Sequence, residues 1–222
     1  MPQSHIFRWR DGSGWLVLSG GGPRESDDVL NIEVAMLGRT LSLGPIAYIW
    51  AAGDVDDADE HMDVLRDLGA RTGYPVDILA EDDEALTREI GEAGVIILGD
   101  GPQSGLLRDA LPGVTLSAIE DAFSRGTTVY AIGASAALFG AYSLFQGELA
   151  AGFDWLVQAI IMPDYDPEQA DTLRAWVQRH PEGYGLGLGR GAALALGPHG
   201  EIELWGNAAI TVSLGQRYQL EE

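Results

Sequence analysis

Short apolar runs that are typical of buried β-strands alternate with segments of helical periodicity along nearly the whole sequence. Residues 15–19, 95–98 and 128–132 are such runs, and residues 58–68 carry apolar side chains on one side and aspartates on the other. This alternation is typical of a mostly parallel sheet with helices on both faces. We therefore expect an α/β fold with a doubly wound, mostly parallel sheet and flanking helices.

The other expected elements continue the same pattern. Further strands are expected over residues 45–52 and 76–79. Further helices are expected over residues 27–37, 83–93, 116–125, 135–144 and 167–180. Near the C-terminus the sequence pattern becomes typical of β-strands. We expect terminal hairpins there because turn residues separate the runs 192–196, 201–205 and 209–214.

The length and composition are compatible with one domain over residues 1–222. Of the 222 residues, 46% are hydrophobic, which is enough to bury a sizeable core. The sequence has no apolar run long enough to span a membrane, and residues 1–15 mix charged with apolar side chains, unlike a signal peptide. We therefore expect a cytoplasmic protein that does not bind membranes.

The charged residues and the missing cysteine exclude several kinds of chemistry. The net charge is −21, from 34 acidic and 13 basic residues, so a nucleic-acid backbone would be repelled. All 13 basic residues are arginines, which excludes a Schiff-base lysine or a Ser-Lys dyad. Without cysteine, the chain has neither a thiol nucleophile nor thiolate metal ligands.

The strongest local motif is the strand-turn-helix segment 129–137, in which small residues surround Ser135. This pattern is typical of a nucleophile elbow, a strained turn that would point Ser135 at solvent. The Ala136 N–H at the helix start would then lie where an oxyanion forms. The alternative interpretation is that Ser135 only caps the helix, as serines often do.

Two glycine-rich loops follow expected strands and should lie at the carboxyl edge of the sheet. Residues 99–103 read Gly-Asp-Gly-Pro-Gln, and residues 20–22 are three glycines. Ligands bind at this edge in doubly wound folds, and glycines let backbone N–H groups approach a ligand. The second loop is a weak dinucleotide signal because it lacks the G-x-G-x-x-G spacing. We expect no cofactor.

The order of these motifs resembles the cyanophycinase and peptidase E family of serine peptidases. The shared features are a glycine cluster after the first strand, a glycine-rich loop ending in Gln103, a buried strand entering Gly-x-Ser-Ala, and a Gly-x-Gly segment before terminal hairpins. The resemblance implies a class I glutamine amidotransferase-like fold. It also implies that Ser135 is the nucleophile, that Gly101 and Ala136 form the oxyanion hole, and that Gln103 contacts substrate.

Several positions depart from that family pattern. Asp164 stands where the resemblance implies the histidine base, and a carboxylate of ordinary pKa is a poor base for a serine. Asp100 stands where a glycine is expected and would oppose charge developing in an oxyanion hole. Ala137 replaces a second elbow glycine, and the segment 187–190 has glycine and arginine in place of acidic residues.

The four histidines do not restore a base in any obvious way. We expect each to lie on the surface, with His61 near the polar face of its helix. Their scatter gives no metal-ligand spacing, so we expect no metal. The histidines are His5, His61, His180 and His199.

Three hypotheses follow for the function. In the first, the chain is a serine hydrolase of a peptide or amide that acts through Ser135, with His180, His199 or the second subunit of a homodimer supplying the base. In the second, it is a non-catalytic descendant that binds a small molecule, a peptide or a protein partner. In the third, Asp100 or Asp164 carries a different reaction in the same cleft. Substrate-binding candidates are Gln103, Asp100 and Asp164.

Overall fold

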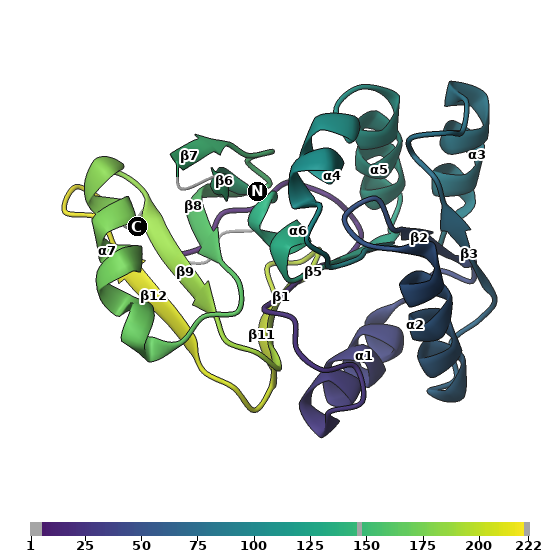
Figure 1. Cartoon of the computed structure of the whole chain (residues 1–222), viewed down its shortest axis with the longest axis horizontal. Helices are drawn as coiled ribbons and strands as arrows, with labels where there is room; N and C mark the ends of the chain where they lie inside the picture. The colour runs from purple at the N-terminus through teal and green to yellow at the C-terminus, as the bar shows by residue number, and fades with distance from the viewer. Residues whose placement is uncertain (1–5, 146–147, 220–222) are drawn as a thin grey trace.

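The computed structural model describes residues 6–145 and 148–219, and these fold around two sheets (Figure 1). The first sheet has the strand order β11-β10-β1-β5-β4-β2-β3. Strands β1, β5, β4, β2 and β3 run parallel, whereas β10 and β11 join antiparallel at one end. Its strands are β1 (Leu16–Ser19), β2 (Ile46–Ile49), β3 (Gly73–Val76), β4 (Val95–Leu98), β5 (Thr128–Ile132), β10 (Ala192–Leu196) and β11 (Ile202–Gly206).

Helices cover both faces of the first sheet because its strands are apolar on both sides. Val17 and Tyr130 point to the face covered by α1 and α2, while Leu18 and Ala131 point to the face covered by α3, α4 and α5 (Figure 1). The helices are α1 (Asp27–Arg39), α2 (Val55–Asp67), α3 (Asp83–Glu92), α4 (Ser104–Ala110) and α5 (Val114–Ser124). The doubly wound arrangement expected from the sequence is confirmed.

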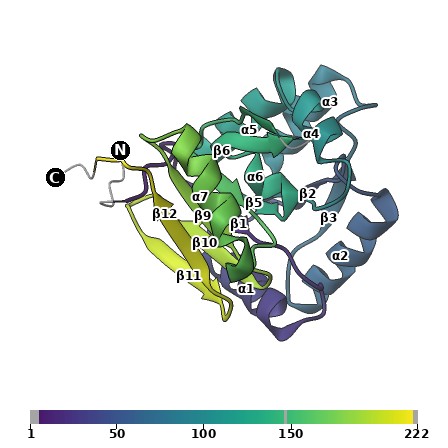
Figure 2. The same cartoon turned by 60° about the vertical axis from the view of Figure 1, so that its left-hand side comes forward.

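The second sheet has the strand order β12-β9-β8-β6-β7, and one end of it forms the left side of Figure 1. Strands β6, β8 and β9 are parallel, and β7 and β12 pair antiparallel with β6 and β9. Helix α7 (Ala170–Arg179) lies beside β9 and β12 (Figure 2). The strands are β6 (Gly140–Phe145), β7 (Glu148–Ala151), β8 (Leu156–Met162), β9 (Tyr184–Leu188) and β12 (Ile210–Leu214).

Side-chain caps explain where the first three helices begin. The Ser26 side chain accepts the Val29 N–H at the start of α1, and Asp54 and Asp82 accept N–H groups in the first turns of α2 and α3. Each cap satisfies a backbone donor that has no partner within its own helix, an effect worth about 1 kcal/mol. Aspartate and glutamate in these first turns also complement the helix dipole.

The main difference from the expected elements lies after β5. Instead of one helix over residues 135–144, a single turn, α6 (Ala134–Ala137), leads directly into β6. The chain therefore passes from the first sheet to the second at this turn. The run 192–196 forms the expected hairpin with β11, whereas β12 crosses to pair with β9. The remaining helix before α7 is the 3₁₀ turn η1 (Pro167–Gln169).

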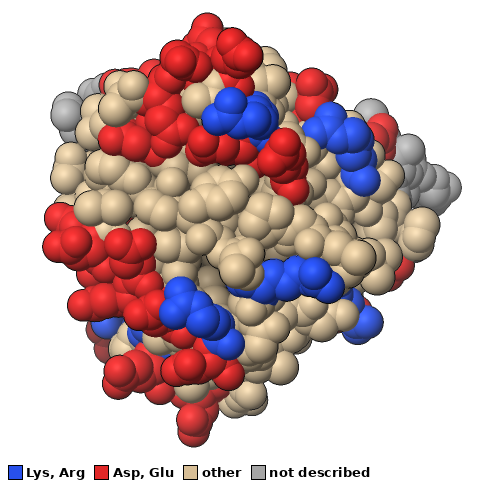
Figure 3. All heavy atoms as spheres, turned by 90° about the vertical axis from the view of Figure 1, so that its right-hand side faces the viewer, with Lys and Arg blue, Asp and Glu red and all other residues tan. Residues whose placement is uncertain are grey.

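Acidic side chains cover much of the surface at the β3 edge of the first sheet. Figure 3 shows them in separate groups on either side of an uncharged belt. Helices α2 and α3 flank β3 and carry many of the carboxylates, including Asp56, Asp57, Asp83 and Glu84. Within the described part of the chain, no helix has the length and apolar character needed to cross a membrane.

Candidate functional site

The strained position of the strand-turn-helix segment is Gly133, directly after β5. Its φ is 55° and its ψ is −125°, a conformation that residues with a side chain rarely adopt. In a nucleophile elbow, the nucleophile occupies this strained turn and the next backbone N–H contributes to the oxyanion hole. By backbone geometry the nucleophile position is therefore Gly133, which has no side chain, and the next amide belongs to Ala134.

Ser135 lies two residues further, inside α6, and does not have the geometry expected from the sequence. Its side chain is fully buried instead of facing solvent, and its hydroxyl donates a 2.5 Å hydrogen bond to the Gly99 carbonyl. The Ala136 N–H donates to the Gly133 carbonyl at 3.0 Å, so it is already used within the turn. In this structure Ser135 joins α6 to the loop after β4.

The Asp100 carboxylate occupies the space beside the elbow. One oxygen, Oδ1, accepts the N–H groups of Gly101 at 2.8 Å and Ala134 at 2.9 Å. A Cβ built on Gly133 would lie less than 3.0 Å from three atoms of this carboxylate, closer than side-chain carbons approach other atoms. Asp100 therefore fills the position of both an elbow side chain and the oxyanion that such a site would bind.

Asp164 and Arg190 form an ion pair near the same edge. Asp164 follows β8 with a φ of 50°, and its N–H donates to the Gly20 carbonyl at 3.0 Å. Its carboxylate accepts both Nε and one terminal nitrogen of Arg190, the latter at 2.8 Å. The hydrogen bond and the charge of Asp164 raise the pKa of Arg190. The Asp164 carboxylate is thus paired with the Arg190 guanidinium.

The remaining candidates from the sequence are Gln103 and three of the histidines. Gln103 is exposed at the start of α4, and its backbone N–H donates to the Ala52 carbonyl at 2.8 Å. His199 is exposed in the β10–β11 turn, and the His180 ring stacks on Tyr142 with centroids 3.8 Å apart. His5 falls outside the described residues. Residues 6–145 and 148–219 contain no group of three His, Cys, Asp or Glu that could hold a metal ion.

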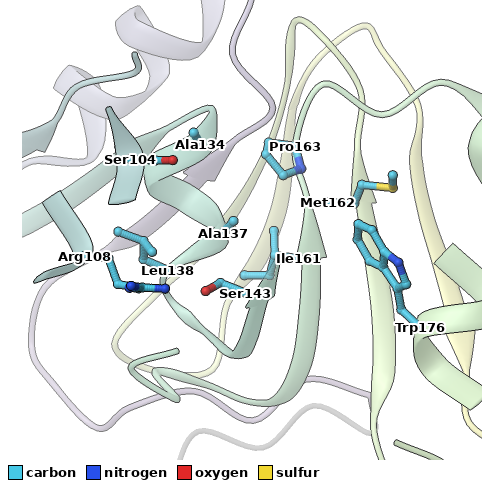
Figure 4. A pocket seen from close by; sticks show the side chains of 10 residues that line it. All are labelled: Ser104, Arg108, Ala134, Ala137, Leu138, Ser143, Ile161, Met162, Pro163 and Trp176. Carbon is cyan, nitrogen blue, oxygen red and sulfur yellow. The ribbon is translucent and has the colours of Figure 1, made fainter. Parts of the chain in front are cut away.

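An apolar pocket of about 230 Å³ lies between α6 and the second sheet (Figure 4). The buried Ser143 hydroxyl faces it and has no hydrogen-bond partner within the described chain. Mostly apolar walls with a few polar groups are typical of sites for small molecules. The lining residues are Ser104, Arg108, Ala134, Ala137, Leu138, Ser143, Ile161, Met162, Pro163 and Trp176.

A second, smaller hollow of about 50 Å³ lies on the α1 and α2 side of the elbow. His61 is buried there, not exposed on a polar helix face as expected. Its Nε2 lies 2.5 Å from Oε1 of the fully buried Glu33, and its Nδ1 lies 3.0 Å from the Tyr48 hydroxyl. The lining also includes Ser19, Gly21, Gly22, Arg24, Val29, Asp100, Tyr130 and Ile132.

Two tyrosines of the hollow stay protonated well beyond neutral pH. Burial raises the pKa of Tyr48 and Tyr130, and the nearby Glu33 carboxylate raises both further. The positive charge of Arg24 lowers the pKa of Tyr48 and so offsets part of this increase. Their hydroxyls are therefore hydrogen-bonding groups and not phenolate nucleophiles.

Comparison with known proteins identifies the fold. No protein-family model matches the sequence, and a search of curated proteins finds no match. A peptidase from an acI-B1 actinobacterium superposes with a TM-score of 0.73 at 16% identity, over 92% of this chain and 93% of that one. A candidate peptidase E from Listeria monocytogenes EGD-e superposes with a TM-score of 0.62 at 14% identity, over 88% and 99%. The chain has a peptidase E-like fold.

Proposed function

We propose that this chain is a ligand-binding protein built on a peptidase E-like fold, and that it does not use Ser135 as a nucleophile. The observation that carries the proposal is the Asp100 carboxylate, which accepts the Gly101 and Ala134 amides next to a glycine at the elbow. A permanent negative charge in that position opposes the negative charge that develops during acyl transfer.

The burial of Ser135 supports the same conclusion. A serine nucleophile needs a base within hydrogen-bond reach and an accessible oxygen. Here the hydroxyl is fully buried and donates to the Gly99 carbonyl, which can accept a proton in a hydrogen bond but cannot remove it. Asp164, at the position of the implied base, is paired with Arg190.

The apolar pocket is the proposed ligand site. Leu138, Ile161 and Trp176 offer apolar walls, and the unpartnered Ser143 hydroxyl offers a hydrogen bond at the same cavity (Figure 4). A ligand with a compact apolar body and one polar group fits this combination, because burying an unpaired hydroxyl is costly. A small peptide with an apolar side chain, or a small molecule of similar character, meets that description.

A hydrolase is the second candidate, and the observation in its favour is that the two solved structures compared above are described as peptidases. For Ser135 to attack a carbonyl, its hydroxyl would have to leave Gly99 and the Asp100 carboxylate would have to vacate the two amides. Both changes oppose interactions that are present in this structure.

Fluorophosphonate labelling mapped by mass spectrometry separates the two candidates. We expect no adduct on Ser135 under conditions in which an active serine peptidase labels fully. An adduct on Ser135 that disappears in Ser135→Ala would overturn the binding proposal in favour of the hydrolase.

Blocking the pocket tests the binding half of the proposal. Ala137 lines the cavity, so Ala137→Leu should fill part of it and weaken peptide or fragment binding. Ala175 is exposed on α7 beside Trp176, so Ala175→Leu is the matched control that adds the same atoms outside the cavity. Isothermal titration calorimetry measures binding in both variants. Equal binding by the two variants would place the ligand elsewhere.

A further inference from the structure

The hollow on the α1 and α2 side of the elbow contains a buried carboxylate oxygen that receives no hydrogen bond from the described part of the chain. With His61 neutral and protonated on Nε2, its N–H goes to Glu33 Oε1 and the Tyr48 hydroxyl donates to Nδ1. The second oxygen of the Glu33 carboxylate, Oε2, is buried and has no partner within residues 6–145 and 148–219. Both hydrogens of this cluster are therefore already used, and neither reaches Oε2.

The Tyr130 hydroxyl is a second buried group at the hollow. The Ser19 side chain lowers the pKa of Tyr130, but the two side chains make no hydrogen bond of ordinary geometry, and the Tyr130 hydroxyl has no other partner in the described part of the chain. At the rim, Oδ1 of Asp100 accepts two backbone amides, and Oδ2 of the same carboxylate lies against Gly21 and Gly133. Buried polar atoms are almost always satisfied in native proteins, so unpartnered ones that line a hollow indicate a missing partner.

The charges around the hollow favour a cation as that partner. Glu33 and Asp100 contribute carboxylates. Arg24 also lines the hollow, but its guanidinium lies 3.2 Å from Asp57 and 3.6 Å from Glu60, so carboxylates outside the hollow offset part of its charge.

The volume of the hollow and its hydrogen-bond acceptors restrict which cation can bind there. A volume of about 50 Å³ admits an ammonium group or a few waters but no bulky ligand. A primary ammonium group offers three donors and no acceptor, which complements carboxylate and hydroxyl oxygens. A divalent metal ion would need about six oxygen ligands, more than these side chains offer.

We propose that this hollow binds the ammonium group of a primary amine, with Glu33 Oε2 and the Tyr130 hydroxyl as acceptors and Asp100 at the entrance. The rest of such a ligand extends past Gly21 and Gly22 toward the elbow. The site shares no lining residue with the apolar pocket, so it stands independently of the function proposed above.

Titration with methylammonium, followed by the backbone amide NMR signals of Gly21 and Asp100, tests the site. We expect saturable shifts with methylammonium and none with tetramethylammonium, which has the same charge but no N–H donor. Shifts that do not saturate, or equal shifts with the two cations, would overturn the proposal.

Two variants locate the binding groups. Glu33→Gln should weaken methylammonium binding about tenfold or more, because it removes a charge-assisted hydrogen bond. Glu81→Gln is the matched control, since Glu81 also accepts a hydrogen bond, in its case from the Asp77 N–H, but lies outside the hollow.

The second variant keeps the test valid if Glu33→Gln folds poorly. Tyr130→Phe removes only an oxygen that accepts no hydrogen bond of ordinary geometry from the described part of the chain, so it should leave stability unchanged or raised while weakening methylammonium binding about threefold or more. Unchanged affinity in this variant, or in a folded Glu33→Gln protein, refutes the assignment.

Discussion

The contact between Gly133 and Asp100 can be measured as a coupling free energy. Gly133→Ala places a Cβ on a residue with a φ of 55° and also drives it into the Asp100 carboxylate. The backbone strain costs about 1–3 kcal/mol. Moving the carboxylate away breaks its hydrogen bonds to the Gly101 and Ala134 amides, at about 1 kcal/mol each. The variant should therefore lose about 3–5 kcal/mol of unfolding free energy.

Asp100→Gly removes the carboxylate, so only the backbone strain remains when Gly133→Ala is added to it. The double-mutant cycle should give a coupling of about 2 kcal/mol, measured by urea denaturation of the four proteins. Gly69→Ala is the control for strain alone, since Gly69 also has a positive φ but a Cβ there meets no atom within 4 Å. A coupling near zero would show that the carboxylate does not occupy the elbow.

Three other predictions follow from buried and exposed groups. Ser135→Ala should cost about 1–3 kcal/mol, seen in urea denaturation, because it removes the buried bond to the Gly99 carbonyl; a freely accessible nucleophile would cost almost nothing. Arg190→Gln should change stability only slightly, and high salt should erase the difference, because its pair with Asp164 is exposed. Stability should also fall steeply above about pH 10, because three buried tyrosines have a folded-state pKa above the unfolded value and release their protons only on unfolding. They are Tyr48, Tyr130 and Tyr184. Together they should remove about 4 kcal/mol per pH unit in denaturation measurements, and with no lysine in the chain a flat profile there would contradict their burial.

Periodicity predicted most elements of the first sheet because most of its strands are separate apolar runs. The strand expected over residues 76–79 lies instead at 73–76, where the edge strand β3 is mostly not buried, and α4 was not expected. Periodicity also failed after Ser135, where the run of small and apolar residues 135–144 is compatible with either a helix or a strand. Contact with β8 decides in favour of β6, and this contact joins residues that are distant in sequence. Local spacing carries no information about such pairing.

The sequence motif is centred on Ser135, two residues beyond the strained turn of the structure. The sequence Gly-x-Ser-Ala drew attention to Ser135, whereas the structure has its strained turn at the glycine that directly follows the strand. The length of the strand decides this register. Because β5 ends at Ile132, the next residue must make the turn, and Gly133 can adopt the required φ without strain.

The buried carboxylate was missed although the sequence contains a signal for it. Glu33 follows Val29 by four residues and precedes Met36 by three, so it lies on the apolar face of α1. His61 follows Ala58 by three residues and precedes Leu65 by four, so it lies on the apolar face of α2. Charged residues on the apolar faces of two successive helices indicate that the helices could share a buried pair, and the structure has it.

With the Asp100 carboxylate in place, the elbow resembles a hydrolase site that still holds its carboxylic acid product. Amide hydrolysis leaves a carboxylic acid among the amides of the oxyanion hole, and here the chain itself supplies that acid. A tethered group acts as a competitor at an effective concentration in the millimolar range or above. Free carboxylic acids are therefore poor competitors for the Gly101 and Ala134 amides, and ligands that reach the elbow are selected for groups other than a carboxylate.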